Sequence, residues 1–229
     1  MTLPASASLR VDGGKNGGVS VKGENRSDVL VKACVNTWGD GDEASEAIAG
    51  RVRIGTSPAI KADGGHESYY SVSYEIRVPQ STNLKLNAHN GGISINSVDG
   101  MLEFETTNGG VNLQDVAGDV VGRTTNGGVN VRLSGSSWKG NGLNFTTSNG
   151  GVNLTLPATY AANIETGTVN GGFKSDIPSL NITTGDEKGG EWSGHRREKR
   201  IATSLNGGGA PVKVMTTNGG IRINSTENE

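Results

Sequence analysis

The triplet Asn-Gly-Gly is the feature that most constrains this sequence, because it recurs eight times along the chain. The copies begin at Asn16, Asn90, Asn108, Asn126, Asn149, Asn170, Asn206 and Asn218. Three consecutive copies are spaced by 18 residues. The next intervals, of 23 and 21 residues, fit the same unit with insertions, the interval of 36 fits a doubling, and the last interval is 12. A fixed period indicates a repeat architecture in which each unit packs mainly on its neighbours.

Short alternating segments follow most of the triplets and indicate β-strands. Their apolar pairs are Ile93 and Ile95, Val111 and Leu113, Val129 and Val131, Val152 and Leu154, and Ile221 and Ile223. A period of two places these side chains in a core and the residues between them, such as Asn112 and Asn130, in water. Asn and Gly tolerate a positive φ, so each triplet is expected at a turn or corner.

Two architectures fit a turn followed by a strand. If each triplet were the loop of an antiparallel hairpin, Gly122 would pair with Val131 and Val121 with Arg132, which are poor partners. If each triplet were a corner of a parallel β-solenoid, Asn, Thr and Val would stack on identical residues of the next coil. We therefore predict an all-β fold, a single parallel β-solenoid of short coils with a repeat of about 18 residues.

The whole chain, 1–229, is predicted to be one β-repeat domain. Less regular N-terminal coils occupy 9–80, regular repeats 81–183, an exposed insert 184–204 and a last coil 205–224. Residues 40–50 are also expected to be an exposed loop, because their helix-favouring stretch is too short to be stable alone. An apolar share of 32% and 37 glycines fit the thin core of such a stack.

Charge limits the expected classes of binding partner, and cysteine content limits the possible covalent crosslinks. With 21 basic and 23 acidic residues the formal charge is −2, so a nucleic-acid partner is not expected. The single cysteine, Cys34, cannot close an intramolecular disulfide. No long apolar segment predicts a membrane span in this chain.

The order of three motifs carries a family resemblance. Ser73–Pro79 reads SYEIRVP, repeated Thr-Thr-Asn-Gly-Gly units follow, and Leu205–Pro211 reads LNGGGAP before a final Thr-Thr-Asn-Gly-Gly. From about Leu9 to Asn224 the chain resembles the toast-rack family, bacterial β-strand repeats of unknown function whose adhesin label is mostly inferred. The resemblance implies a right-handed, β-helix-like solenoid and an extracytoplasmic location, in the periplasm, at the cell surface or secreted, assuming a removed signal peptide. Relatives often carry Ser, Arg or Asp at the third triplet position, where this chain has Gly.

Catalytic chemistry finds little support in the sequence. His66, His89 and His195 lie in or beside glycine-rich turns without metal-ligand spacing. Glu103 and Glu105 are explained by a polar outer face, whereas glycoside hydrolysis needs a facing pair of carboxylates in a cleft. The resemblance adds no catalytic residues. We predict no catalytic residue, no metal site and no cofactor.

Four residues are candidates for ligand contact. Arg196 and Arg197 lie in a dense charge run that could dock an acidic polysaccharide or a lipid headgroup, although a solvated loop also explains them. Trp192 and Trp138 lie in glycine-rich inserts, where an exposed indole could stack on a sugar ring. The alternative is that these inserts fold back to cover the edge of a coil.

The sequence thus favours a non-catalytic binding or scaffold module of the cell envelope or secreted fraction, with an adhesin role and an unidentified ligand. The partner is unidentified, with a glycan or another envelope protein as the candidates. The alternatives are a carbohydrate-active enzyme on a β-helix scaffold and a purely structural spacer.

Overall fold

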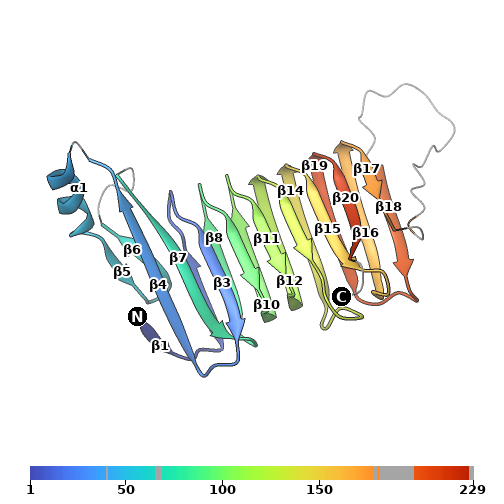
Figure 1. The fold of residues 1–229 in the computed structure, drawn as a ribbon, viewed down its shortest axis with the longest axis horizontal. Helices are drawn as coiled ribbons and strands as arrows, with labels where there is room; N and C mark the ends of the chain where they lie inside the picture. Colours follow the sequence, from blue (N-terminus) through green and yellow to red (C-terminus); the bar gives the residue numbers. More distant parts are fainter. Residues whose placement is uncertain (40, 65–68, 178–179, 181–198, 227–229) are drawn as a thin grey trace.

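The computed structural model describes residues 1–39, 41–64, 69–177, 180 and 199–226, which form two stacked sheets in an elongated molecule (Figure 1). Sheet A contains, in spatial order, β1 (Thr2–Pro4), β4 (Asp28–Thr37), β7 (Tyr70–Pro79), β3 (Val19–Glu24), β9 (Ile93–Asn96), β11 (Val111–Gln114), β13 (Val129–Arg132), β15 (Val152–Pro157), β20 (Ile221–Thr226) and β17 (Phe173–Ser175). Sheet B contains β18 (Lys199–Leu205), β16 (Ala162–Asn170), β19 (Pro211–Asn218), β14 (Gly142–Asn149), β12 (Ala117–Asn126), β10 (Asp99–Thr106), β8 (Asn83–Ala88), β2 (Ser8–Asp12), β6 (Ile60–Asp63) and β5 (Arg53–Gly55).

The chain alternates between the sheets through the central repeats. From β8 to β17, successive strands belong to sheet B and then sheet A, so each pair of strands makes one layer of the stack. Strands of neighbouring layers pair in parallel, and residues 18 positions apart align between β8, β10 and β12 and between β9, β11 and β13. The predicted all-β fold with parallel strands is confirmed. Hairpins at these triplets are excluded, because the flanking strands lie in different sheets.

One apolar core fills the space between the sheets, and it is built from the predicted alternating positions. All ten residues of the five apolar pairs are buried, with at most 3% of their surface exposed. Full burial of such a side chain contributes about 1.5–3 kcal/mol relative to leaving it in water. The inward assignment made from the sequence is therefore confirmed.

Seven of the eight triplet asparagines form a ladder at one corner of the stack. Their order is Asn16, Asn90, Asn108, Asn126, Asn149, Asn218 and Asn170, and each Nδ2 donates to the Oδ1 of the residue before it. Asn206 makes a different turn, with a φ of 49°, and its Nδ2 donates to the carbonyl oxygens of Ala158 and Tyr160. The ladder satisfies amide groups between coils, as stacked asparagines do in other in-register sheets.

A row of buried threonines supports the same corner from inside. Thr106, Thr124 and Thr147 donate from Oγ1 to the middle-glycine carbonyls of the preceding layers, over 2.8–3.0 Å. The hydroxyls of these three threonines are thus used for hydrogen bonds within the stack.

The N-terminal end departs from the expected loop. Residues 42–49 form a helix, α1 (Asp42–Ala49), where the sequence analysis expected an irregular exposed segment. Its side chains remain at least partly exposed, but Asp42 and Glu43 complement the positive helix N-terminus. Thr37 donates from Oγ1 to the Ser45 carbonyl, over 3.0 Å, which attaches the helix to β4. Tertiary contact therefore stabilises a helix too short to form alone.

The C-terminal end has an order that the sequence does not reveal. The layer made of β19 and β20 is last in the chain, yet it lies between the β14–β15 layer and the β16–β17 layer (Figure 1). The end of the predicted insert 184–204 forms β18, which pairs antiparallel with β16. Over the described ranges, no helix is both long and apolar enough to cross a membrane.

Candidate functional site

The outer face of sheet B carries ion pairs between neighbouring strands. Lys85 lies 2.7 Å from Glu103 on the neighbouring strand, and Arg123 forms an ion pair with Glu105. The Arg123 pair raises the pKa of its guanidinium, chiefly through the hydrogen bond to Glu105. Because each of these carboxylates is bound to a cation on a flat sheet, Glu103 and Glu105 do not form the facing pair that glycoside hydrolysis requires.

The outer face of sheet A carries a polar row that is mostly neutral. The row is one register position on each of seven strands: Ser20, Ser94, Asn112, Asn130, Asn153, Arg222 and Lys174. Within the described part of the chain, the exposed side chains of Asn112 and Asn130 make no hydrogen bond. Each offers an amide donor and a carbonyl acceptor to solvent.

A furrow without side chains runs beside the polar row. We call it the glycine furrow, and it comprises the third triplet glycines Gly18, Gly92, Gly110, Gly128, Gly151, Gly220 and Gly172. Two hollows of about 520 Å³ and 570 Å³ lie along it, and both are lined by Asn130. The absence of a Cβ at these positions therefore leaves room above the backbone, next to unused amide groups.

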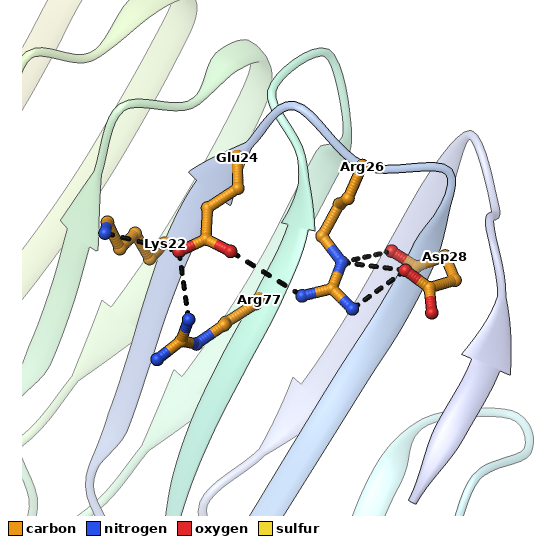
Figure 2. A network of polar contacts seen from close by, with 5 residues as sticks. All are labelled: Lys22, Glu24, Arg26, Asp28 and Arg77. Carbon is orange, nitrogen blue, oxygen red and sulfur yellow. Dashed lines mark hydrogen bonds and ion pairs between the residues drawn. The ribbon is translucent and has the colours of Figure 1, made fainter.

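A network of charged side chains lies at the C-terminal end of β3, around Glu24 (Figure 2). The Glu24 carboxylate lies 3.2 Å from Lys22 Nζ and 3.3 Å from Arg77 Nη1, and Arg26 Nη2 lies 2.8 Å from Asp28 Oδ1. The hydrogen bond from Lys22, followed by the charges of Arg77 and Arg26, holds the pKa of Glu24 below its usual range, against the opposing effect of burial. These contacts tie β3, β4 and β7 together, and we interpret them as structural.

The described residues offer no cluster for a metal ion. No three His, Cys, Asp or Glu side chains come together over the described ranges.

Of the four predicted ligand-contact residues, only Trp138 lies in the described part of the chain. Trp138 is 7% exposed, and its Nε1 donates to the Gly118 carbonyl over 3.0 Å. This burial matches the alternative in which the insert folds back over a coil edge, and it removes the indole from a sugar-stacking role in this conformation. Trp192, Arg196 and Arg197 lie outside the described residues.

Other residues on the sheet A face were not singled out from the sequence. Asn112 and Asn130 were recognised only as outward positions, and the signal that could have marked them was their recurrence at the repeat interval. Trp38 and Tyr69 lie outside the triplets, so the repeat gives no signal for them, yet they are 46% and 52% exposed.

Similarity to known proteins identifies the family of this chain. No curated protein matches the sequence. One solved structure, titled a "putative cell adhesion protein" from Clostridium sporogenes, is 12% identical, with 99% of this chain and 98% of that chain covered and a TM-score of 0.42. A likeness this distant supports no conclusion on function. The Toastrack DUF4097 family model matches residues 2–224, so this chain belongs to that family, as its motifs indicated.

Proposed function

We propose that this protein is a non-catalytic binding module of the cell envelope or secreted fraction, in which a parallel β-solenoid with an 18-residue unit displays the outer face of sheet A. The ligand is an extended molecule that makes many weak contacts along the glycine furrow. Its location is extracytoplasmic. A right-handed winding, which the family resemblance implies, belongs to the same proposal.

The observation that carries the proposal is the position of exposed amides beside the hollows of sheet A. Within the described residues, the side chains of Asn112 and Asn130 make no hydrogen bond, and Asn130 lines both hollows. A buried polar group needs a hydrogen-bond partner within the protein, whereas an exposed amide remains available to form a hydrogen bond with a ligand. Repetition of these groups along a stiff stack allows several weak contacts to act together.

Matched arginine substitutions on the two faces test the proposal. Asn130→Arg would fill the point where the hollows meet, and Asn144→Arg would place the same side chain on an exposed position of sheet B. The probe is an array of immobilised neutral and acidic oligosaccharides, read with a fluorescent protein fused to the C-terminus. We expect the parent to bind a subset, Asn144→Arg to match the parent, and Asn130→Arg to lose at least about tenfold in affinity, equivalent to about 1.4 kcal/mol.

The outcomes separate the alternatives. Equal loss in both variants would contradict the assignment of sheet A as the binding face. No binding by the parent would favour a protein partner or the structural spacer. Release of shortened oligosaccharides by the parent would instead support the carbohydrate-active enzyme.

A further inference from the structure

Trp38 and Tyr69 stand opposite each other just beyond the paired ends of β4 and β7. The Trp38 backbone N–H donates to the Tyr69 carbonyl over 3.0 Å, which extends the antiparallel register of Thr37 and Tyr70 by one pair. Directly opposed residues in such a pair project to the same side, with Cβ atoms about 4.5–5.5 Å apart. The two rings are therefore held next to each other by the backbone.

The rings lie on the outer face of sheet A. Tyr70, the neighbour of Tyr69, is buried at 5% exposure, so alternation directs Tyr69 and Trp38 outward. Ser73 lies four residues along β7 from Tyr69 and lines the hollow at the Gly18 end of the glycine furrow. At about 3.3 Å per residue, the aromatic pair is about 13 Å from that end.

The chemistry around the pair fits a sugar ring. The apolar face of a pyranose packs against an indole or phenol ring, whose amphipathic character suits a wet surface. Asn36 and Ser71 oppose each other on the same face, one row closer to the furrow, and they supply an amide and a hydroxyl for ring hydroxyl groups.

Local charge favours a neutral ligand. Helix α1, attached to β4 beside Trp38, carries Asp42, Glu43 and Glu46 and has no basic residue. Acidic side chains disfavour an anionic sugar at close range.

We propose that Trp38 and Tyr69 form a stacking subsite for a neutral pyranose residue of a glycan whose chain continues into the glycine furrow. This inference rests on the proposed function, because it names the ligand class for the same face. The sugar ring lies over the two aromatic rings, and Asn36 and Ser71 hydrogen-bond to its hydroxyls. The polar row then meets the following sugar residues at the strand spacing of about 4.8 Å.

Calorimetric titration with neutral cellohexaose and chitohexaose tests the subsite, with a galacturonic acid hexamer as the anionic comparison. We expect the parent to bind a neutral oligomer and to bind the acidic one at least tenfold more weakly. Trp38→Ala and Tyr69→Ala should each weaken the neutral interaction at least tenfold. Trp38→Phe, which keeps a stacking ring, should recover most of the affinity.

Met101→Ala is the matched control, because Met101 is a large apolar side chain, 61% exposed, on β10 of sheet B. It should bind like the parent. Thermal melting of every variant separates lost stacking from lost folding, since a purely structural aromatic pair would lower the melting temperature and leave the affinity of the folded protein unchanged.

Two results would overturn the inference in different ways. If Asn130→Arg abolishes binding while Trp38→Ala and Tyr69→Ala bind like Met101→Ala, the aromatic subsite is wrong and the proposed function stands. If the parent binds neither neutral oligomer, or prefers the acidic one, the neutral glycan is wrong. If, in addition, Asn130→Arg and Asn144→Arg bind the oligosaccharide array equally, both the neutral-glycan inference and the proposed function are wrong.

Discussion

Replacement of a middle triplet glycine by alanine should break the closest approach between layers. A Cβ on Gly127 would collide with the Gly109 carbonyl oxygen and with Gly110 N, which are backbone atoms that cannot rotate away. Overpacking of this kind costs about 1–3 kcal/mol. Separation of these two layers would also strain the bonds from Asn126 N to the Thr107 carbonyl and from Thr124 Oγ1 to the Gly109 carbonyl, each worth about 1 kcal/mol. We expect Gly127→Ala to lower the free energy of unfolding by about 2–4 kcal/mol.

The adjacent glycine provides the control. A Cβ on Gly128 would meet nothing closer than the Gly151 carbonyl oxygen at 3.6 Å, so Gly128→Ala should be neutral or stabilise by up to about 1 kcal/mol through the unfolded state. For a chain of this length 1 kcal/mol shifts the melting temperature by about 2–4 °C, which predicts a loss of roughly 5–15 °C for Gly127→Ala. Circular dichroism melting measures both variants. Equal melting temperatures for the two would refute the close-packing argument.

Three further changes probe the core, the ladder and a buried phenol. Val129→Asp buries an unpaired carboxylate at a site 1% exposed and should cost at least about 4 kcal/mol, seen as lost strand signal at 25 °C; parent-like melting would contradict the inward assignment. Asn126→Ala removes the ladder bonds to Asn108 and Asn149 and should cost about 1–2 kcal/mol by urea unfolding. Burial raises the pKa of Tyr160 from 10.0 to about 12, so the unfolded state loses its proton first and stability should fall as pH rises from 10 to 12. In Tyr160→Phe, that decline should be smaller.

The sequence predicted the repeat, the parallel pairing and the inward residues because each depends on local period. Val111 and Val129 are 18 residues apart and become direct partners, so one interval determines the register of the central strands. The same interval carries no information on where a non-repeating segment docks. The helix at 42–49 required its attachment to β4, and Trp138 required the carbonyl of Gly118, 20 residues away.

The order of layers at the C-terminal end is a second limit of periodicity. The Thr and Asn positions of β14, β16 and β19 are equivalent, so this pattern alone does not specify whether β16 or β19 pairs with β14. β18 pairs antiparallel with the outer edge of β16, and β19 lies on the other side of β16, between β16 and β14. Repetition specifies register more strongly than neighbour order.

The candidate face was less predictable than the fold, although it arises from the same repeat. The sequence marks Asn112 and Asn130 as outward, but only the structure shows that their side chains are unpaired and that glycines hollow the surface beside them. Trp38 and Tyr69 lie outside any repeat and meet only through the pairing of β4 with β7, which joins segments more than 30 residues apart.

The two glycines of each triplet have different physical constraints, and this difference links scaffold to function. In the seven triplets of the asparagine ladder, a Cβ on the middle glycine would lie within about 2 Å of a backbone oxygen, so this residue cannot be replaced without loss of stability. The third glycine at Gly128, Gly151, Gly220 and Gly172 leaves ordinary contact distances or open space for a side chain, whereas a Cβ at Gly18 or Gly92 would lie 3.3 or 3.1 Å from a backbone oxygen. A change there alters the outer face of sheet A without moving the layers. Under the proposed function, a substitution at one of these positions would change the ligand contacts of the furrow at one strand, and glycine leaves the most room for a flat, neutral ligand.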